Sequence, residues 1–115
     1  MKILAVDTSC DETSASVCDN DWVLSNIVFS QIDLHKKWRG VVPIIAKRAH
    51  QERIDPVIDL ALKRARLGIE DIDIFAVTIG PGLAIALEVG IKRIKELSIK
   101  HQKSLVLVDH MEGHI

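Results

Sequence analysis

The sequence is poor in aromatic residues and in net charge. Its 115 residues include two tryptophans, two phenylalanines and no tyrosine. The core must therefore be aliphatic, and there is no row of aromatic side chains on which single-stranded bases could stack. The formal net charge of −1 gives no overall attraction to nucleic acid or to an anionic membrane. These shortages argue against a stand-alone single-strand binder.

Long apolar runs and a disulfide framework are also missing. No run approaches the ~20 apolar residues of a membrane span, and the first residues turn acidic too soon for a signal peptide. Cys10 and Cys18 are the only cysteines, and we interpret them as reduced thiols. We therefore predict a cytoplasmic protein of one domain with no membrane segment.

What the sequence does contain is an ordered series of strand and helix signals. Strand-like runs occur at KILAV, SASVCD, WVLSNIVFSQ, IDIFAVTI and SLVLVDH. Helical spacing of apolar residues runs from Val42 to Leu67, with Pro43 in the first turn and Gly68 as the expected stop. Pro56 should kink or split this helix. A second helix follows GPGL, and on one side it carries Leu83, Leu87, Ile91 and Ile94.

This order predicts the fold class. Three strands with tight connections suggest an antiparallel meander, and the strand–helix–strand units that follow require parallel neighbours. We therefore predict an α/β fold with a mixed five-stranded sheet, the pattern of a ribonuclease-H-like half domain. The apolar run 72–79 suits a strand that is covered on both faces, and SLVLVDH is predicted to be a last buried strand.

The stretch DTSCDET, residues 7–13, is the first candidate site. Asp7 would lie at the carboxyl end of the first strand, where open α/β sheets place ligands. Asp11 and Glu12 follow in a polar loop with hydroxyls such as Ser9. Carboxylates serve magnesium-bound phosphates or proton transfer, and hydroxyls donate to phosphate oxygens. A solvated turn capped by Asp and Ser explains the same residues equally well.

GPGL, residues 80–83, is the second candidate. Gly80 and Gly82 permit unusual backbone angles, and the helix start behind them would present free N–H groups to an anion. A single Gly-Pro-Gly is a weak signal, so a tight strand-to-helix turn without a ligand is the simpler interpretation.

HMEGH, residues 110–114, is the third candidate. His110 and His114 stand four apart, which places both imidazoles on one face of a helix, a common way to hold a metal. A zinc protease of the H-E-x-x-H kind needs Glu directly after the first His, whereas Met111 stands there. Zinc or iron would need at least one more ligand, for which the remaining histidines are candidates: His35, His50 and His101. Two histidines that begin a surface helix are the alternative.

Four motifs taken in order resemble one family. They are VDTSCDETSASV, then HKKWRGVVP with AKRAH, then VTIGPGLAIALEVG, then HMEGHI. They are similar to the N-terminal part of the TsaD family, the tRNA threonylcarbamoyladenosine transferases formerly called O-sialoglycoprotein endopeptidases. The match runs over the whole chain, and four ordered motifs are far more specific than any one of them.

The resemblance implies an actin-like, sugar-kinase-like (ASKHA) fold with two similar lobes and a cleft between them, residues 1–115 being a single N-terminal lobe. Members transfer a threonylcarbamoyl group from its adenylate to the exocyclic amine of the adenosine beside the tRNA anticodon. Asp11 and Glu12 would correspond to the acidic residues near the reacting centre. Our candidates for binding the adenylate or ATP-linked ligand are Asp7, Ser9, Gly80 and Gly82.

The resemblance also implies cofactors and partners. His110 and His114 would hold iron or zinc together with an Asp from the second lobe, and the metal would act as a Lewis acid toward the adenylate. Bacterial members work with a TsaB-like paralog bound through the N-terminal lobe and with an ATPase subunit. The tRNA would be bound only by the complete enzyme.

Several positions depart from the family pattern. Ile44 stands where Glu is usual, so a carboxylate is missing. Arg39 replaces the first of two glycines, Ile85 lies where a second glycine often follows GPGL, and Asp109 replaces Asn before the first histidine. The missing carboxylate at Ile44 favours a polypeptide that has no catalytic activity of its own.

These 115 residues do not carry the second lobe or the third metal ligand. We therefore predict no tight metal binding and no transfer by the chain alone, because histidines on a frayed end would lose entropy on ordering. Uncovered apolar surface favours a homodimer. Two functions stay open: the N-terminal lobe of a transferase, or a non-catalytic truncated paralog that binds a partner. A sugar- or acetate-kinase-like lobe would not explain HMEGHI.

Overall fold

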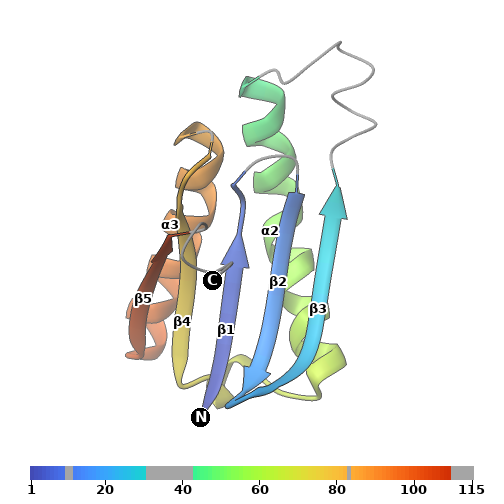
Figure 1. Cartoon of the computed structure of the whole chain (residues 1–115), viewed down its shortest axis with the longest axis vertical. Coiled ribbons are helices and arrows are strands. Elements are labelled where there is room, and N and C mark those ends of the chain that lie inside the picture. The colour runs from blue at the N-terminus through green and yellow to red at the C-terminus, as the bar shows by residue number, and fades with distance from the viewer. Residues whose placement is uncertain (10–11, 31–42, 83, 110–115) are drawn as a thin grey trace.

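The computed structural model describes residues 1–9, 12–30, 43–82 and 84–109. In these segments a five-stranded sheet carries two helices on one face (Figure 1). The elements are β1 (Lys2–Asp7), β2 (Glu12–Asp19), β3 (Trp22–Ser30), α2 (Pro43–Ala65), the 3-10 helix η1 (Ile69–Asp71), β4 (Ile74–Gly80), α3 (Ala84–His101) and β5 (Ser104–Asp109). The predicted order of strands and helices is confirmed.

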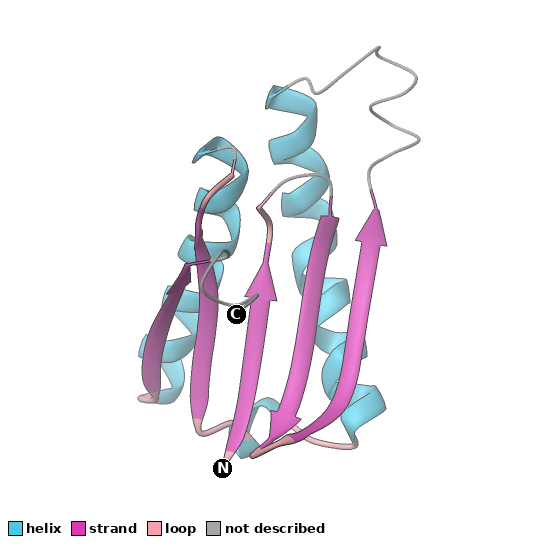
Figure 2. Cartoon of the chain, viewed as in Figure 1, coloured by secondary structure: helices cyan, strands magenta, loops and turns pink. Residues whose placement is uncertain are grey.

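The sheet is mixed and has the order β3-β2-β1-β4-β5. β1 pairs antiparallel with β2 and β2 with β3, whereas β1 pairs parallel with β4 and β4 with β5. The strands form one layer and the helices a second (Figure 2). Because β2 runs opposite to its neighbours, its first residue lies at the same edge as the last residues of β1, β4 and β5. We call this edge the carboxyl edge.

The core lies between the sheet and the two helices. Leu4 and Phe75 from the sheet are wholly buried, and so are Val57 of α2 and Ile94 of α3. Burial of an aliphatic side chain of this size contributes about 1.5–3 kcal/mol, so the sheet and helices stabilise each other. Neither helix in the described segments is long and apolar enough to cross a membrane.

The course and the end of α2 decide between the expectations from the sequence. Of the kink or split expected at Pro56, the split does not occur, since buried side chains on both sides of the proline, including Ile54 and Ile58, hold both halves on the sheet. Gly68 is not the stop. The helix ends at Ala65, and Arg66 takes the left-handed conformation with φ 60°.

The strands correct two further predictions. β2 begins at Glu12, so Glu12 and Thr13 are paired strand residues and not part of a loop. β5 is an edge strand, and Leu107 is 55% exposed, so it is not a buried strand. The prediction for β4 is confirmed, because Phe75 and Thr78 and the residues between them are all buried.

Candidate functional site

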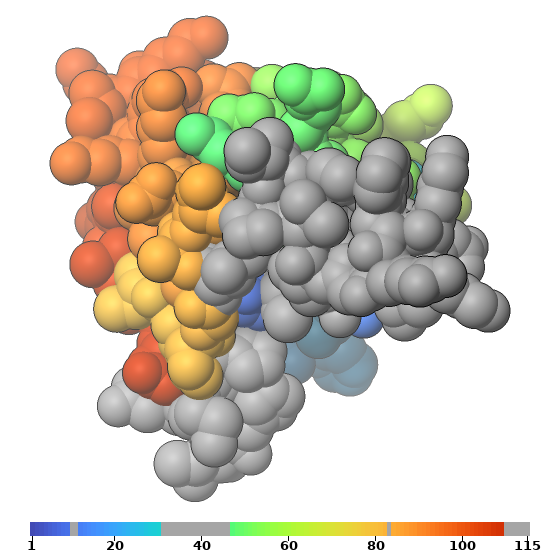
Figure 3. All heavy atoms as spheres, turned by 90° about the horizontal axis from the view of Figure 1, so that it is seen from above, coloured from blue at the N-terminus to red at the C-terminus, as the bar shows by residue number. Residues whose placement is uncertain are grey.

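Residues of the predicted motifs from three strands, β1, β2 and β4, meet at the carboxyl edge. Asp7 ends β1, Glu12 begins β2 and Gly80 ends β4. Figure 3 looks down on this edge, where the yellow end of β4 and the orange start of α3 lie beside the blue of the first strands. The topology confirms that Asp7 ends the first strand, and it brings the start of DTSCDET and the GPG of the second motif to the same edge of the sheet.

Asp7 and Ser9 form a local turn. The backbone N–H of Ser9 donates to Asp7 Oδ1 at 2.6 Å, an arrangement that lets an aspartate end a strand in a tight turn. Asp7 has a further interaction, and its bond to the Ser9 N–H is the backbone capping that the sequence allowed.

Gly82 brings the GPG segment against this turn. A Cβ placed on Gly82 would overlap the backbone carbonyl oxygen of Ser9, so only glycine allows the two backbones to lie this close. At Gly80 a Cβ would meet no atom within 4 Å, and the Gly80–Pro81 peptide bond is cis. Ser9 and Gly82, two predicted binding residues, are therefore neighbours in the structure.

Asp109 brings the end of β5 to the GPG segment. The register of β4 and β5 shifts between Thr78 and Gly80 and pairs Gly80 with Asp109. The chain thus leaves β5 beside the GPG segment. The predicted residues Asp11, His110 and His114 lie outside the described residues, as do Arg39 and the side chain of Ile44.

Two buried threonines behind the edge were missed as site residues. Thr8 Oγ1 donates to the carbonyl of Ala86 at 2.7 Å and accepts from the N–H of Gly90 at 3.2 Å, which fixes the end of β1 to α3. Thr13 Oγ1 lies 2.6 Å from His50 Nδ1, which fixes the start of β2 to α2. No sequence signal separates these hydroxyls from the surface hydroxyls that share their motif.

The remaining histidines do not complete a metal site in the described segments. His50 is wholly buried against Thr13. His101 ends α3 at the opposite edge of the sheet and stacks on Phe75, with ring centroids 6.4 Å apart. His35 lies outside the described residues. Among residues 1–9, 12–30, 43–82 and 84–109 no group of three or more His, Cys, Asp or Glu could hold a metal ion.

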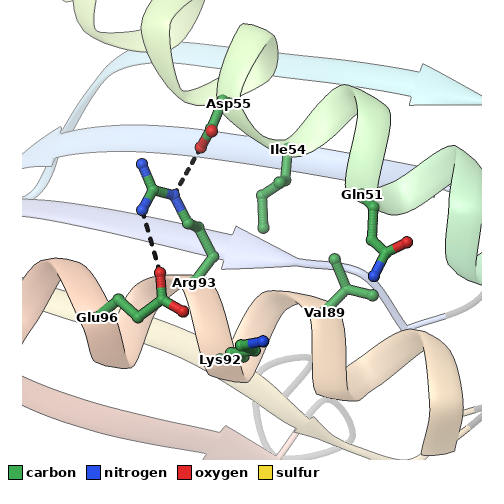
Figure 4. Close-up of a pocket in the computed structure, with 7 residues that line it drawn as sticks. All are labelled: Gln51, Ile54, Asp55, Val89, Lys92, Arg93 and Glu96. Atoms are coloured by element: carbon green, nitrogen blue, oxygen red, sulfur yellow. Dashed lines mark hydrogen bonds and ion pairs between the residues drawn. The ribbon is translucent and has the colours of Figure 1, made fainter.

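A hollow of 180 Å³ lies elsewhere, between α2 and α3 (Figure 4). Arg93 of α3 bridges it: its Nε donates to Asp55 Oδ1 at 2.7 Å and its Nη1 to Glu96 Oε2 at 3.3 Å. The hydrogen bond to Asp55 raises the pKa of the guanidinium. None of the predicted site residues lines this hollow, so it is separate from the carboxyl edge.

Comparison with known proteins identifies the family of this sequence. The sequence model of TsaD, tRNA N6-adenosine threonylcarbamoyltransferase, matches residues 22–115. Proteins of that name from Anaeromyxobacter sp. and Thermomicrobium roseum are 48% and 53% identical over 116 residues, which is 100% of this chain. The alignments cover 35% and 32% of those proteins, so the chain spans about a third of the length of these relatives.

Solved structures show the same fold. YeaZ from Pseudomonas aeruginosa superposes with a TM-score of 0.75 over 94% of this chain and 43% of that chain, at 19% identity. This likeness shows the fold alone, and it confirms the predicted actin-like (ASKHA) half domain. Since the family model matches most of the chain and the relatives are about half identical over all of it, the chain belongs to the TsaD family of tRNA N6-adenosine threonylcarbamoyltransferases.

Proposed function

We propose that residues 1–115 form the N-terminal lobe of a tRNA adenosine threonylcarbamoyltransferase and supply the near wall of its cleft. The carboxyl edge carries this proposal: Asp7, Ser9, Glu12 and Gly82 meet there, and the strand that leads into HMEGH ends beside them at Asp109. Open α/β sheets bind ligands at this edge.

The carboxylates have a defined task in such a transfer. The exocyclic amine of adenosine forms a bond to the carbamoyl carbon, the bond from that carbon to the adenylate oxygen breaks, and the amine loses a proton. A carboxylate within reach can accept that proton. Glu12 is exposed at the start of β2 and is suited to the role, which we assign to it together with Asp11.

The hydroxyl and backbone groups have a binding task. Ser9 is half-buried, and its backbone lies against Gly82; its hydroxyl could donate to a phosphate oxygen of the adenylate. At Gly80 a Cβ would meet no atom within 4 Å, so this glycine leaves space for a ligand to approach the backbone, whereas Gly82 lets the segment lie against Ser9. We propose Asp7 as the residue that keeps this turn in place, through its bond to the Ser9 N–H.

The chemistry of the proposed donors suits a metal ion. Two imidazoles from His110 and His114 with a carboxylate from the rest of the protein form a set that suits zinc or iron. The pairing of Asp109 with Gly80 brings the chain to the carboxyl edge one residue before His110. The bound ion would supply Lewis acidity toward the adenylate.

A chimera tests the proposed function. Residues 1–115 replace the matching N-terminal third of the Thermomicrobium roseum relative, to which they are 53% identical. The chimera receives threonylcarbamoyl adenylate, unmodified tRNA and the relative's partner proteins. We expect modified adenosine from the chimera and none from residues 1–115 alone. A folded chimera without activity would contradict the proposal and favour the alternative, a non-catalytic partner-binding module.

We further propose that this lobe acts in the cytoplasm and associates through its surface, with a TsaB-like paralog or with a second copy. The edge strands support association, because Trp22 and Val23 on β3 are 77% and 65% exposed, and exposed apolar edges favour pairing. Light scattering of residues 1–115 at tens of micromolar should give twice the monomer mass. A monomer at that concentration would contradict the homodimer.

A further inference from the structure

We propose that Thr8 and Thr13 are positioning residues that fix the two ends of the segment carrying Ser9 and Glu12. This inference rests on the proposed function. It starts from the observation that both threonines are wholly buried, whereas the residues beside them at the carboxyl edge are not: Ser9 is half-buried and Glu12 is exposed. Each threonine binds a different helix, so the segment is held at both ends.

The Thr8 end is held by the backbone of α3. Ala86 and Gly90 are four residues apart, so their C=O and N–H are partners in the helical hydrogen-bond pattern. Thr8 Oγ1 donates to the first at 2.7 Å and accepts from the second at 3.2 Å. A Cβ on Gly90 would lie 2.7 Å from that oxygen, so the glycine is what admits the hydroxyl.

The Thr13 end is held by a side chain of α2. His50 and Thr13 are both 0% exposed, and Thr13 Oγ1 lies 2.6 Å from His50 Nδ1. A buried hydrogen bond is directional and strengthened by its low-dielectric surroundings. It therefore fixes the start of β2 more tightly than apolar packing of the same volume would. The residue fixed next to it is Glu12.

Valine would fill both positions with the same shape and without a buried polar group. A structure that needed only packing would have no use for two hydroxyls that must each find a partner inside the core. The hydroxyls flank the residues that meet substrate in the proposed reaction. Residues of this kind hold a site to within a fraction of an ångström.

The chain offers a matched control in Ser25. This side chain is also buried, and its Oγ donates to a backbone carbonyl of α2, that of Ala61, at 2.7 Å. Ser25 pairs with Val17, four residues along β2 from Thr13, which is about 13 Å from the carboxyl edge. Ser25→Ala therefore removes a buried hydroxyl hydrogen bond to the same helix, here to a backbone carbonyl, without touching the site.

The test measures transfer by the chimera described above. We expect Thr13→Val to lower kcat by about 10-fold to 100-fold, as small misplacements of reacting groups do, with KM changed less than about twofold. Thr13→Ser should keep kcat, because it keeps the hydroxyl. Ser25→Ala should lower the Tm and leave kcat unchanged. If Thr13→Val keeps kcat, or if Ser25→Ala lowers it as much, the proposal is overturned.

His50 gives a second pair of variants in case Thr13→Val fails to fold. In His50→Asn the side-chain amide can take the place of Nδ1 as the partner of Thr13, so kcat should be kept. His50→Leu has no such group and should lower kcat as much as Thr13→Val does. Equal kcat in both would overturn the proposal. An inactive parent chimera contradicts the proposed function instead. In that case hydrogen exchange of the Glu12 amide is measured in residues 1–115. Thr13→Val should speed this exchange more than Ser25→Ala does. An equal effect of the two substitutions would contradict a positioning role for Thr13.

Discussion

At the residue scale, α2 and α3 are each followed by a residue in the left-handed conformation that favours glycine. Arg66 has φ 60° and Gln102 has φ 55°. After α2 the N–H of Arg66 donates to the carbonyl oxygen of Lys63 at 3.1 Å, and the N–H of Leu67 donates to the carbonyl oxygen of Leu62 at 3.0 Å. These two bonds are the Schellman motif. The motif satisfies the last carbonyls at the cost of a strained side-chain-bearing residue.

Arg66→Gly should raise the free energy of unfolding by about 0.5–1 kcal/mol. Glycine removes the left-handed penalty of about 1–2 kcal/mol and gives back part of it through the freedom of the unfolded chain. Urea denaturation measures the change. The control Arg64→Gly, inside the last turn of α2, should lower stability by about 1 kcal/mol. A loss of stability in both variants would contradict the Schellman assignment.

Asp73, the residue before β4, is hydrogen-bonded to Lys2 at the start of β1. Its carboxylate accepts from the Lys2 N–H at 2.8 Å, and its own N–H donates to the Lys2 carbonyl at 2.8 Å. The hydrogen bond from Lys2 holds the pKa of Asp73 below its ordinary value, and the positive charge of Lys103 acts in the same direction. The ionised form is therefore preferred in the folded chain.

A lowered pKa in the folded state predicts the pH dependence. The stabilisation is present above the ordinary Asp value of about 3.9 and is lost as the pH falls through the lower folded value. Asp73→Asn keeps an acceptor and loses the charge. Its deficit in unfolding free energy should be largest near neutral pH and should shrink below about pH 4. Urea titrations at pH 7, 5 and 3 would refute this by giving a constant deficit.

At the scale of elements, the contact between α3 and β1 depends on Gly90. The glycine is buried within the helix, and a Cβ there would lie 2.7 Å from Thr8 Oγ1 and 3.4 Å from Val77 Cγ2. Glycine inside a helix costs about 1 kcal/mol relative to alanine. In return, the missing Cβ allows the helix to lie close to the sheet.

Gly90→Ala should lower the free energy of unfolding by about 1–3 kcal/mol, because overpacking outweighs the gain in helix propensity. Thermal unfolding by circular dichroism is the measurement. Glu88→Ala, at an exposed position of the same helix, should stay within about 0.5 kcal/mol. In the double variant Thr8→Ala/Gly90→Ala the losses should be less than additive. A stabilised Gly90→Ala would show that the contact is not tight.

At the scale of the whole molecule, the pattern of apolar residues was enough to predict the strand order along the chain and the mixed sheet. It also placed Asp7 at the carboxyl end of the first strand, but the meeting of Asp7 with the GPG segment emerged only from the parallel pairing of β1 with β4. It could not reveal that Thr13 reaches His50, because that bond exists only once α2 lies on β2. Nor could it show that α2 runs through Pro56, since packing against the sheet overrides a local preference.

The pairing of β1 with β4 has a consequence for how the chain acquires its site. The first three strands can pair as hairpins between close neighbours in the sequence, whereas Ile3 meets Ile74 only after a long loop closes. Closing that loop costs entropy before any contact compensates for it, and such pairings form slowly. Gly82 reaches Ser9 only after β4 has joined β1. We therefore expect the carboxyl edge to be completed late in folding, after the antiparallel part of the sheet has formed.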